Sequence, residues 1–184
     1  MSADSPTRPD PAAEAAVNID RLVRWADDFP VKGVRFADLT PVFADARGLS
    51  SIIDALAASH NGADLVAGID ARGFLLGAGV ALALDSGVLA VRKAGKLPPP
   101  VVSQSYQLEY GSAELEIPEN IDVAGRKVLV VDDVLATGGT IAATVELLRS
   151  RGADVVAAAV VLEISALGGR SRCAGYPLAC LRQV

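Results

Sequence analysis

Residues 128–140 read Val-Leu-Val-Val-Asp-Asp-Val-Leu-Ala-Thr-Gly-Gly-Thr, and this stretch decides which fold the chain can adopt. Val128–Val131 form a short aliphatic run, which is typical of a strand buried on both faces of a parallel sheet. The acidic pair Asp132 and Asp133 follows at its carboxyl end, and the small residues of 136–140 then lead into a helical pattern. The stretch therefore predicts a strand, a loop and a helix in that order.

The loop is a candidate anion site, because backbone N–H groups at the start of a helix are free and lie at the positive end of its dipole. Gly138 and Gly139 allow a phosphate to approach the backbone closely, and Thr137 and Thr140 add hydroxyl donors. The adjacent acids would repel a phosphate, but they can accept hydrogen bonds from the vicinal hydroxyls of a ribose that carries it. The alternative is that the glycines only make a tight turn, yet a plain turn needs neither adjacent acids nor flanking threonines. The pattern is neither a Walker loop nor a dinucleotide-binding turn.

Composition sets the class of protein. The chain has 184 residues, of which 51% are hydrophobic and 4% aromatic, and a formal net charge of −5. This length predicts one domain over residues 13–184, preceded by a disordered tail over residues 1–12 that lacks a targeting pattern. The acidic balance argues against non-specific nucleic-acid binding, and no apolar run is long enough to span a membrane. Cys173 and Cys180 fit no metal spacing and are expected to be reduced packing residues in a cytoplasmic protein.

Strands and helices are expected to alternate along the chain, which predicts an α/β fold with a mainly parallel sheet flanked by helices. Ligands bind such sheets at the carboxyl ends of strands, where the direction of the crossover changes. The expected helices are 13–26, 49–57, 74–84 and 141–149, and the expected strands are 65–69, 88–91, 101–106, 113–117, 128–131 and 155–162. Residues 28–41 are expected to be irregular.

Two further segments carry candidate anion ligands. Arg72, in Asp70-Ala71-Arg72-Gly73, follows a predicted strand and suits a bidentate grip on pyrophosphate, although it could be a surface residue. Arg92, Lys93 and Lys96 lie on a short loop after another strand. A basic run is usually only solvated, but this one follows an apolar strand and ends in prolines. Binding of pyrophosphate is therefore a plausible role for it.

Taken together, the segments resemble the type I phosphoribosyltransferases, and within that family the members that use adenine. The resemblance extends from Trp25 to Gly169 and includes Phe29-Pro30-Val31-Lys32-Gly33-Val34-Arg35-Phe36, Asp38-Leu39-Thr40-Pro41-Val42 and residues 106–117. It implies the type I fold with a small N-terminal hood and a hairpin lid. It also implies that one peptide bond within residues 70–73 is cis.

The resemblance implies a role for each candidate residue. The phosphoribosyl group is held by Asp132, Asp133, Ala136, Thr137, Gly138, Gly139 and Thr140. Pyrophosphate is held by Arg72, Arg92, Lys93 and Lys96, and adenine by Arg35, Phe36, Ala37 and Ile164, with Phe36 stacked on the ring and Arg35 and Ala37 contributing backbone groups. Glu109, Tyr110 and Arg72 are implied as catalytic residues, the first two on the lid.

The implied reaction transfers a phosphoribosyl group from phosphoribosyl pyrophosphate to adenine and gives AMP and pyrophosphate. Mg²⁺ is the implied cofactor, bound through pyrophosphate and ribose near Asp132 and Asp133, and a homodimer is the implied assembly. Two alternatives remain from the residues alone: a non-catalytic sensor of phosphoribosyl pyrophosphate, and an enzyme of the same class that uses xanthine or orotate. The absence of DNA-binding helices disfavours the first, and the hood around Phe36 disfavours the second.

Overall fold

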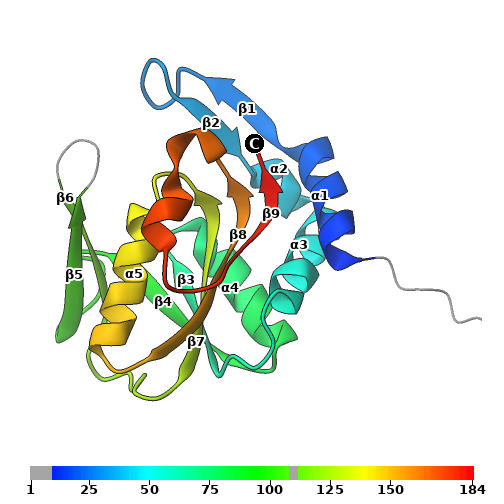
Figure 1. Ribbon diagram of the computed structural model, residues 1–184. Coiled ribbons are helices and arrows are strands. Elements are labelled where there is room, and N and C mark those ends of the chain that lie inside the picture. Colours follow the sequence, from blue (N-terminus) through cyan, green and yellow to red (C-terminus); the bar gives the residue numbers. More distant parts are fainter. Residues whose placement is uncertain (1–9, 108–111) are drawn as a thin grey trace, which may run out of the picture.

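The computed structural model describes residues 10–107 and 112–184, and its main sheet has seven strands in the order β5-β6-β4-β3-β7-β8-β9 (Figure 1). A separate antiparallel pair, β1 and β2, forms a two-stranded sheet. The strands are β1 (Arg24–Asp27), β2 (Arg35–Asp38), β3 (Leu65–Ile69), β4 (Gly87–Lys93), β5 (Val101–Gln107), β6 (Ser112–Pro118), β7 (Lys127–Leu135), β8 (Asp154–Glu163) and β9 (Leu178–Gln183). The helices are α1 (Pro11–Leu22), α2 (Thr40–Ala44), α3 (Ala46–Ala58), α4 (Arg72–Ala83) and α5 (Gly139–Ser150), with short 3₁₀ turns η1 (Ser165–Leu167) and η2 (Gly169–Cys173).

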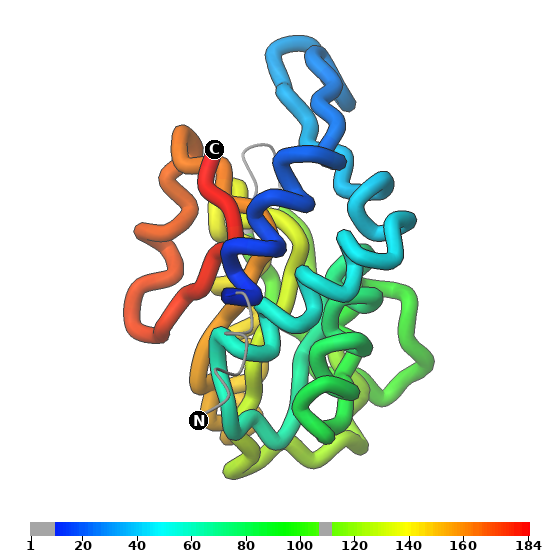
Figure 2. Tube along the Cα trace, turned by 90° about the vertical axis from the view of Figure 1, so that its right-hand side faces the viewer, coloured from blue at the N-terminus to red at the C-terminus, as the bar shows by residue number. Residues whose placement is uncertain are grey.

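Three layers make up the fold. Strands β4, β3, β7, β8 and β9 run parallel, and β5 and β6 add an antiparallel hairpin at one edge. Helix α5 covers one face of the sheet, while α1, α3 and α4 cover the other, as the two perpendicular views show (Figures 1 and 2). The predicted α/β fold with a mainly parallel sheet flanked by helices is confirmed.

The centre of the sheet places the site. All five residues of β3 are buried, and the chain leaves β3 into α4 on one face and β7 into α5 on the other. Because these crossovers diverge between neighbouring strands, a crevice opens at the carboxyl ends of β3 and β7. Helix α4 lies close to β3, since a Cβ atom built on Gly68 would be 2.5 Å from the carbonyl oxygen of Gly73. Glycine at position 68 therefore allows α4 to start directly beside the end of β3.

The β1–β2 hairpin, residues 24–38, is the hood, and it projects beyond the carboxyl ends of the strands (Figure 2). The prediction of a helix through residue 26 is wrong here, because α1 ends at Leu22 and Trp25 lies in β1. Trp25 instead supports the guanidinium of Arg35, 4.5 Å from the ring centre, and Arg35 also pairs with Asp27 at 3.6 Å. These contacts across the hairpin explain why strands form where the Pro and Gly content predicts irregular chain.

Other element bounds differ in smaller ways. Helix α1 begins at Pro11 behind the capping carboxylate of Asp10, so it includes two residues that composition assigns to the tail; residues 1–9 lie outside the described part. Strand β7 continues to Leu135 because β8 pairs with it as far as Glu163. Asp132 and Asp133 therefore lie within β7 rather than after it. Their other neighbour, β3, pairs only to Val131, which leaves the two acids open on that side.

Candidate functional site

The acidic pair lies against the start of α4, as expected from the shared edge of the sheet. The backbone N–H of Asp133 donates to Oδ1 of Asp132 at 2.9 Å, and a Cβ atom built on Gly73 of α4 would lie 3.2 Å from the same oxygen. Asp133 is 7% exposed. Its Oδ2 lies 2.6 Å from a guanidinium nitrogen of Arg72, so this buried carboxylate is held in an ion pair. A carboxylate oxygen can accept more than one hydrogen bond, so the crevice still offers an acceptor to a ligand.

The electrostatics of the pair are unfavourable without a ligand. Burial of the Asp132 carboxyl and the neighbouring charge of Asp133 raise the pKa of Asp132 well above its usual value of 3.8, against the lowering effect of Arg72. An acid whose ionised form is disfavoured gains from hydroxyl donors or a cation nearby. The site is therefore suited to bind a diol or a hard divalent cation.

Arg72 connects the acids to the hood. Its guanidinium donates to the carbonyl oxygen of Ala37 at 3.3 Å and lies 5.3 Å from the centre of the Phe36 ring, besides its ion pair with Asp133. The peptide bond between Asp70 and Ala71, just before it, is cis, as predicted for this loop. Arg72 is thus placed between the predicted adenine residues and the predicted ribose residues.

The loop over residues 136–140 has the strand-to-helix geometry that the sequence predicts for an anion site. Gly138 has φ +79° and precedes α5, so the free N–H groups of the first turn face the cavity that Asp132 and residues 134–141 line. The opposite side of the loop touches backbone, since a Cβ atom on Gly138 would be 2.4 Å from the carbonyl oxygen of Gly169. A Cβ atom on Gly169 would be 2.2 Å from the carbonyl oxygen of Ala136. Residues 136–138 are therefore held by direct backbone contact with the turn at Gly169.

The basic loop after β4 is held by an acid that sequence reasoning missed. Glu116 is 4% exposed and accepts the backbone N–H groups of Gly95, Lys96 and Leu97 at 3.1, 2.8 and 2.8 Å. Burial would raise the pKa of Glu116, but these three N–H groups and Arg92 together lower it. The signal was weak, because Glu116 is one of several acids in an alternating strand. Its carboxylate fixes the loop and leaves the side chains of Lys93 and Lys96 exposed.

The prediction that Arg92 and Lys93 lie on a loop is wrong, because both are the last residues of β4 and pair with β6; only Lys96 lies on the loop. Arg92 also has ionic partners. Its Nε lies 3.4 Å from Oδ2 of Asp70, and its guanidinium lies 5.5 Å from the centre of the Phe74 ring. Together with Arg72, it brings the β3–α4 turn and the β4 loop to one side of the crevice.

The hood and the loop over residues 136–140 line a cavity of about 690 Å³. It is lined by Val31, Lys32, Gly33, Val34, Arg35, Thr137, Ile164 and Leu167. Ile164 is joined to the end of β7 by its N–H, which donates to the carbonyl oxygen of Leu135 at 2.9 Å. The Phe36 ring faces Arg72 and meets Phe29 edge to face at 5.2 Å, outside this lining. The cavity therefore brings Arg35 and Ile164 together, while Phe36 and Ala37 lie on the Arg72 side.

The β5–β6 hairpin is present as predicted for the lid. Near its end, the hydroxyl of Thr140 donates to the hydroxyl of Tyr106 at 3.4 Å, which joins the hairpin to the phosphate loop. Glu109 and Tyr110 lie outside the described residues.

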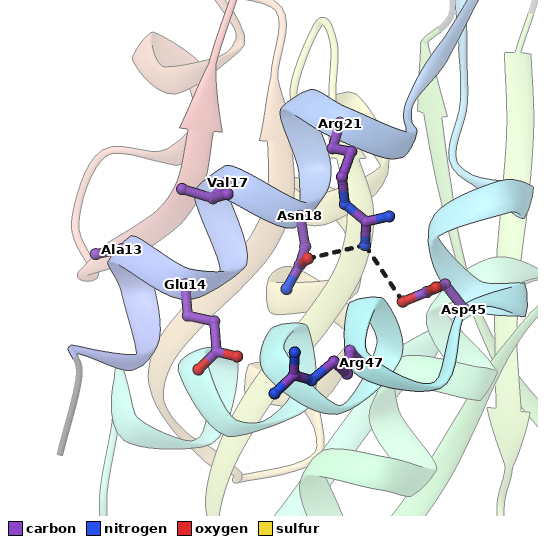
Figure 3. Close-up of a pocket in the computed structure, with 7 residues that line it drawn as sticks. All are labelled: Ala13, Glu14, Val17, Asn18, Arg21, Asp45 and Arg47. Atoms are coloured by element: carbon purple, nitrogen blue, oxygen red, sulfur yellow. Dashed lines mark hydrogen bonds and ion pairs between the residues drawn. The ribbon is translucent and has the colours of Figure 1, made fainter.

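A second groove, of about 660 Å³, lies between α1 and the start of α3 (Figure 3). Arg21 there pairs with Asp45 at 3.5 Å and donates to Asn18 at 3.1 Å. None of the predicted site residues borders it. Within residues 10–107 and 112–184, no group of three or more His, Cys, Asp or Glu side chains could hold a metal ion, and no helix is long and apolar enough to cross a membrane.

Comparisons with known proteins agree with this geometry. Residues 39–174 match the family of the phosphoribosyl transferase domain. An adenine phosphoribosyltransferase of Nocardia farcinica (strain IFM 10152) is 68% identical over 167 residues, which cover 90% of this chain and 87% of that protein. The solved adenine phosphoribosyltransferase of Thermoanaerobacter pseudethanolicus is 41% identical with a TM-score of 0.88, covering 92% of this chain and 99% of that one. The Saccharomyces cerevisiae enzyme, solved with D-2,5-dideoxy-2,5-imino-altritol 1,6-bisphosphate and adenine, is 36% identical with a TM-score of 0.86, covering 92% and 99%.

Proposed function

Since the chain belongs to the phosphoribosyltransferase family, and within it to the adenine phosphoribosyltransferases, we propose that its crevice binds phosphoribosyl pyrophosphate and adenine side by side. The enzyme transfers the phosphoribosyl group to adenine, which gives AMP and pyrophosphate. The observation that carries the assignment is the glycine-rich loop before α5, adjacent to Asp132 and to the buried, ion-paired carboxylate of Asp133.

We assign the 5′-phosphate to the N–H groups and hydroxyls of residues 136–140 and the ribose hydroxyls to Asp132 and Asp133. The capacity of carboxylate oxygens to accept further hydrogen bonds supports the second assignment. Pyrophosphate is assigned to Arg72, Arg92, Lys93 and Lys96, which come from the start of α4, the end of β4 and the loop after β4.

Mg²⁺ fits this site as a cation shared between protein and substrate. The described residues offer an acid pair but no complete set of protein ligands, and Mg²⁺ commonly keeps waters and uses phosphate oxygens for the rest. Asp132 and Asp133 would hold it together with the ribose and pyrophosphate oxygens. When bound, it would neutralise charge on the leaving pyrophosphate.

The protein itself mainly positions the reactants and compensates charge. Departure of pyrophosphate leaves positive charge on the anomeric carbon, as in glycoside cleavage, and the nearby carboxylates stabilise it. Arg72 forms an ion pair with Asp133, so its guanidinium is near enough to stabilise the negative charge that develops on the leaving pyrophosphate. We assign proton exchange at adenine N7 to Glu109, with Tyr110 beside it on the lid, where closure would exclude water.

The base is assigned to the hood side of the crevice. Backbone groups around Arg35 and Ala37 can match the 6-amino group of adenine and a ring nitrogen acceptor, while Phe36 and Ile164 supply apolar contact. Hypoxanthine reverses the pattern of donors and acceptors at positions 6 and 1. Two mismatches would give discrimination on the order of 10⁴-fold, as for sites that reject a substrate through unpaired hydrogen-bonding groups.

A spectrophotometric assay with phosphoribosyl pyrophosphate and each base tests the function. Adenine is expected to be the only base that gives its nucleotide, AMP. Asp133→Asn should raise the KM for phosphoribosyl pyrophosphate and lower kcat in a folded protein. Comparable efficiency with hypoxanthine would overturn the base assignment. Binding of phosphoribosyl pyrophosphate without turnover of any base would instead favour the sensor.

A homodimer is proposed from an apolar row on α4 and β4. Leu75, Leu82 and Val88 are 60%, 83% and 49% exposed, and α4 carries no charged residue after Arg72. Sedimentation analysis of the wild type and of Leu82→Glu would test this, because a charge in the row should favour the monomer. We also assign the enzyme to the cytoplasm, where its two free thiols, Cys173 and Cys180, would stay reduced.

A further inference from the structure

The carboxyl end of β8 carries an ion pair between a buried carboxylate, Glu163, and a partly exposed guanidinium, Arg170, that none of the roles above uses. Glu163, 5% exposed, is the last residue of β8. Both of its carboxylate oxygens accept from Nε of Arg170 at 3.1 Å, and Oε2 also accepts from the Gln183 amide at 3.1 Å. A second nitrogen of Arg170 donates to the carbonyl oxygen of Leu178 at 3.0 Å. The side-chain bond from Arg170, with help from Gln183, lowers the pKa of Glu163, so the carboxylate stays charged.

The ion pair closes a loop of chain over the site. Between its two members lie Ile164, which is at the base cavity, and Gly169, which touches the phosphate loop through backbone alone. Residue 169 offers no side chain to hold it there. Its neighbour Arg170 is bonded both to the end of β8 and to β9. The bonds of Arg170, the next residue in the chain, therefore hold Gly169 against Ala136 and Gly138.

The same end of the sheet fixes Ile164. Its N–H donates to Leu135, and the N–H of Ser165 donates to the carbonyl oxygen of Val184 at 2.9 Å. The N–H of Val184 in turn donates to the carbonyl oxygen of Glu163 at 2.9 Å. Together with the bonds of Arg170 to Glu163 and Leu178, these hydrogen bonds attach the segment at both ends to the sheet.

We propose that Glu163, Arg170 and Gln183 are positioning residues, which act through Gly169 to hold the phosphate loop in the conformation that binds the 5′-phosphate. The inference rests on the proposed function and extends it to three residues that touch no substrate. A loop that shifts by about 1 Å can lose roughly a hundredfold in efficiency, so the network should matter for binding as well as for stability.

The test compares Glu163→Gln with Asp20→Asn. The second variant removes an ion pair from the neighbouring part of β9, where Arg182 lies 2.8 Å from Asp20 with both side chains about half exposed. Steady-state kinetics, thermal unfolding and calorimetric titration with ribose 5-phosphate are measured for both. Glu163→Gln should raise the KM for phosphoribosyl pyrophosphate and the Kd for ribose 5-phosphate about tenfold to a hundredfold, with a smaller change in kcat. Asp20→Asn should leave these constants unchanged.

Two further variants separate positioning from folding. Arg170→Lys keeps a cation and should restore part of the affinity that Arg170→Met loses. The double variant Glu163→Gln/Arg170→Met should bind ribose 5-phosphate no more weakly than the single variant with the higher Kd, because both changes remove the same interaction. If Glu163→Gln does not fold, Gln183→Ala removes only the outer bond and should show a smaller rise in the same constants.

Wild-type constants in the folded variants would overturn the inference, as would equal changes in the Asp20→Asn control. The wild type separates the two levels of the argument. If it binds ribose 5-phosphate and forms AMP, the proposed function stands whatever the variants do; if it does neither, the function itself is wrong.

Discussion

Gly138→Ala should damage substrate binding far more than a strained backbone alone would explain. An L-residue in the left-handed region costs about 1–2 kcal/mol, and Gly138 has φ +79°. The added Cβ atom would also lie 2.4 Å from the carbonyl oxygen of Gly169, where ordinary van der Waals contact begins at 3.4 Å. The two backbones must therefore separate by about 1 Å, a displacement that can cost roughly a hundredfold in kcat/KM.

Gly152→Ala is the matched control. Its φ of +81° is nearly the same, but a Cβ atom there meets only Ala124, at 3.4 Å, and it lies just after the other end of α5. A backbone term of about 1–2 kcal/mol should lower Tm by about 2–8 °C in a domain of this size. Gly152→Ala should show this change in Tm with unchanged kinetics. Gly138→Ala should melt lower still and show a raised KM for phosphoribosyl pyrophosphate.

The measurements are thermal unfolding and initial rates at varied phosphoribosyl pyrophosphate and at varied adenine. A folded Gly138→Ala enzyme with an unchanged KM for phosphoribosyl pyrophosphate would refute the argument that the Gly138–Gly169 contact shapes the phosphate loop. Equal kinetic losses in both variants would show that backbone strain, rather than this contact, is responsible.

Three other changes have distinct expected outcomes. Because the pKa of Asp132 is raised in the folded state, its contribution to stability is present below pH 3.8 and is lost as pH rises through the raised value. Urea unfolding between about pH 4 and pH 8 should show this loss in the wild type and not in Asp132→Asn. The variant should be more stable but less active. A decline of equal size in the variant would exclude Asp132 as its source. Glu116→Gln places an amide donor near the N–H groups of residues 95–97. It should raise the KM for phosphoribosyl pyrophosphate about tenfold and leave the KM for adenine unchanged. Rates that match the wild type would show that the loop does not depend on the carboxylate. Phe36→Ala should weaken adenine binding by about 1–3 kcal/mol, as expected for loss of base stacking. Arg35→Ala should change adenine binding little, because the Arg35 side chain lies on Trp25. A larger loss of affinity for Arg35→Ala than for Phe36→Ala, measured by calorimetric titration with adenine, would contradict the base assignment.

The parts of the fold predicted from sequence are those with a strong local pattern. Residues 65–69 and 128–131 are continuous apolar runs, and both are buried central strands. The resemblance implied the hood, but its two strands were missed because they are short and only partly buried, so alternation gives no signal. Strand β9 was missed for a related reason: its residues at the sheet edge are only half-buried or exposed.

The site divides in the same way. The glycine-rich loop and the acids could be identified from the sequence because all their residues lie within the thirteen positions 128–140. The support of the basic loop by Glu116 and the pairing of Glu163 with Arg170 could not, since nothing in a sequence states which acid meets which donor. Arg72 was identified, but its bonds to Ala37 and Asp133 depend on how the hood folds over α4.

The position of Arg72 has a thermodynamic consequence. One guanidinium contacts the carbonyl of Ala37, the ring of Phe36 and the carboxylate of Asp133, so the proposed base side and the proposed sugar side of the crevice share a single side chain. A ligand that draws Arg72 away from Asp133 changes the surroundings of Phe36 and Ala37 at the same time. The affinities for the two substrates are then coupled, and by linkage each must alter the other by the same factor.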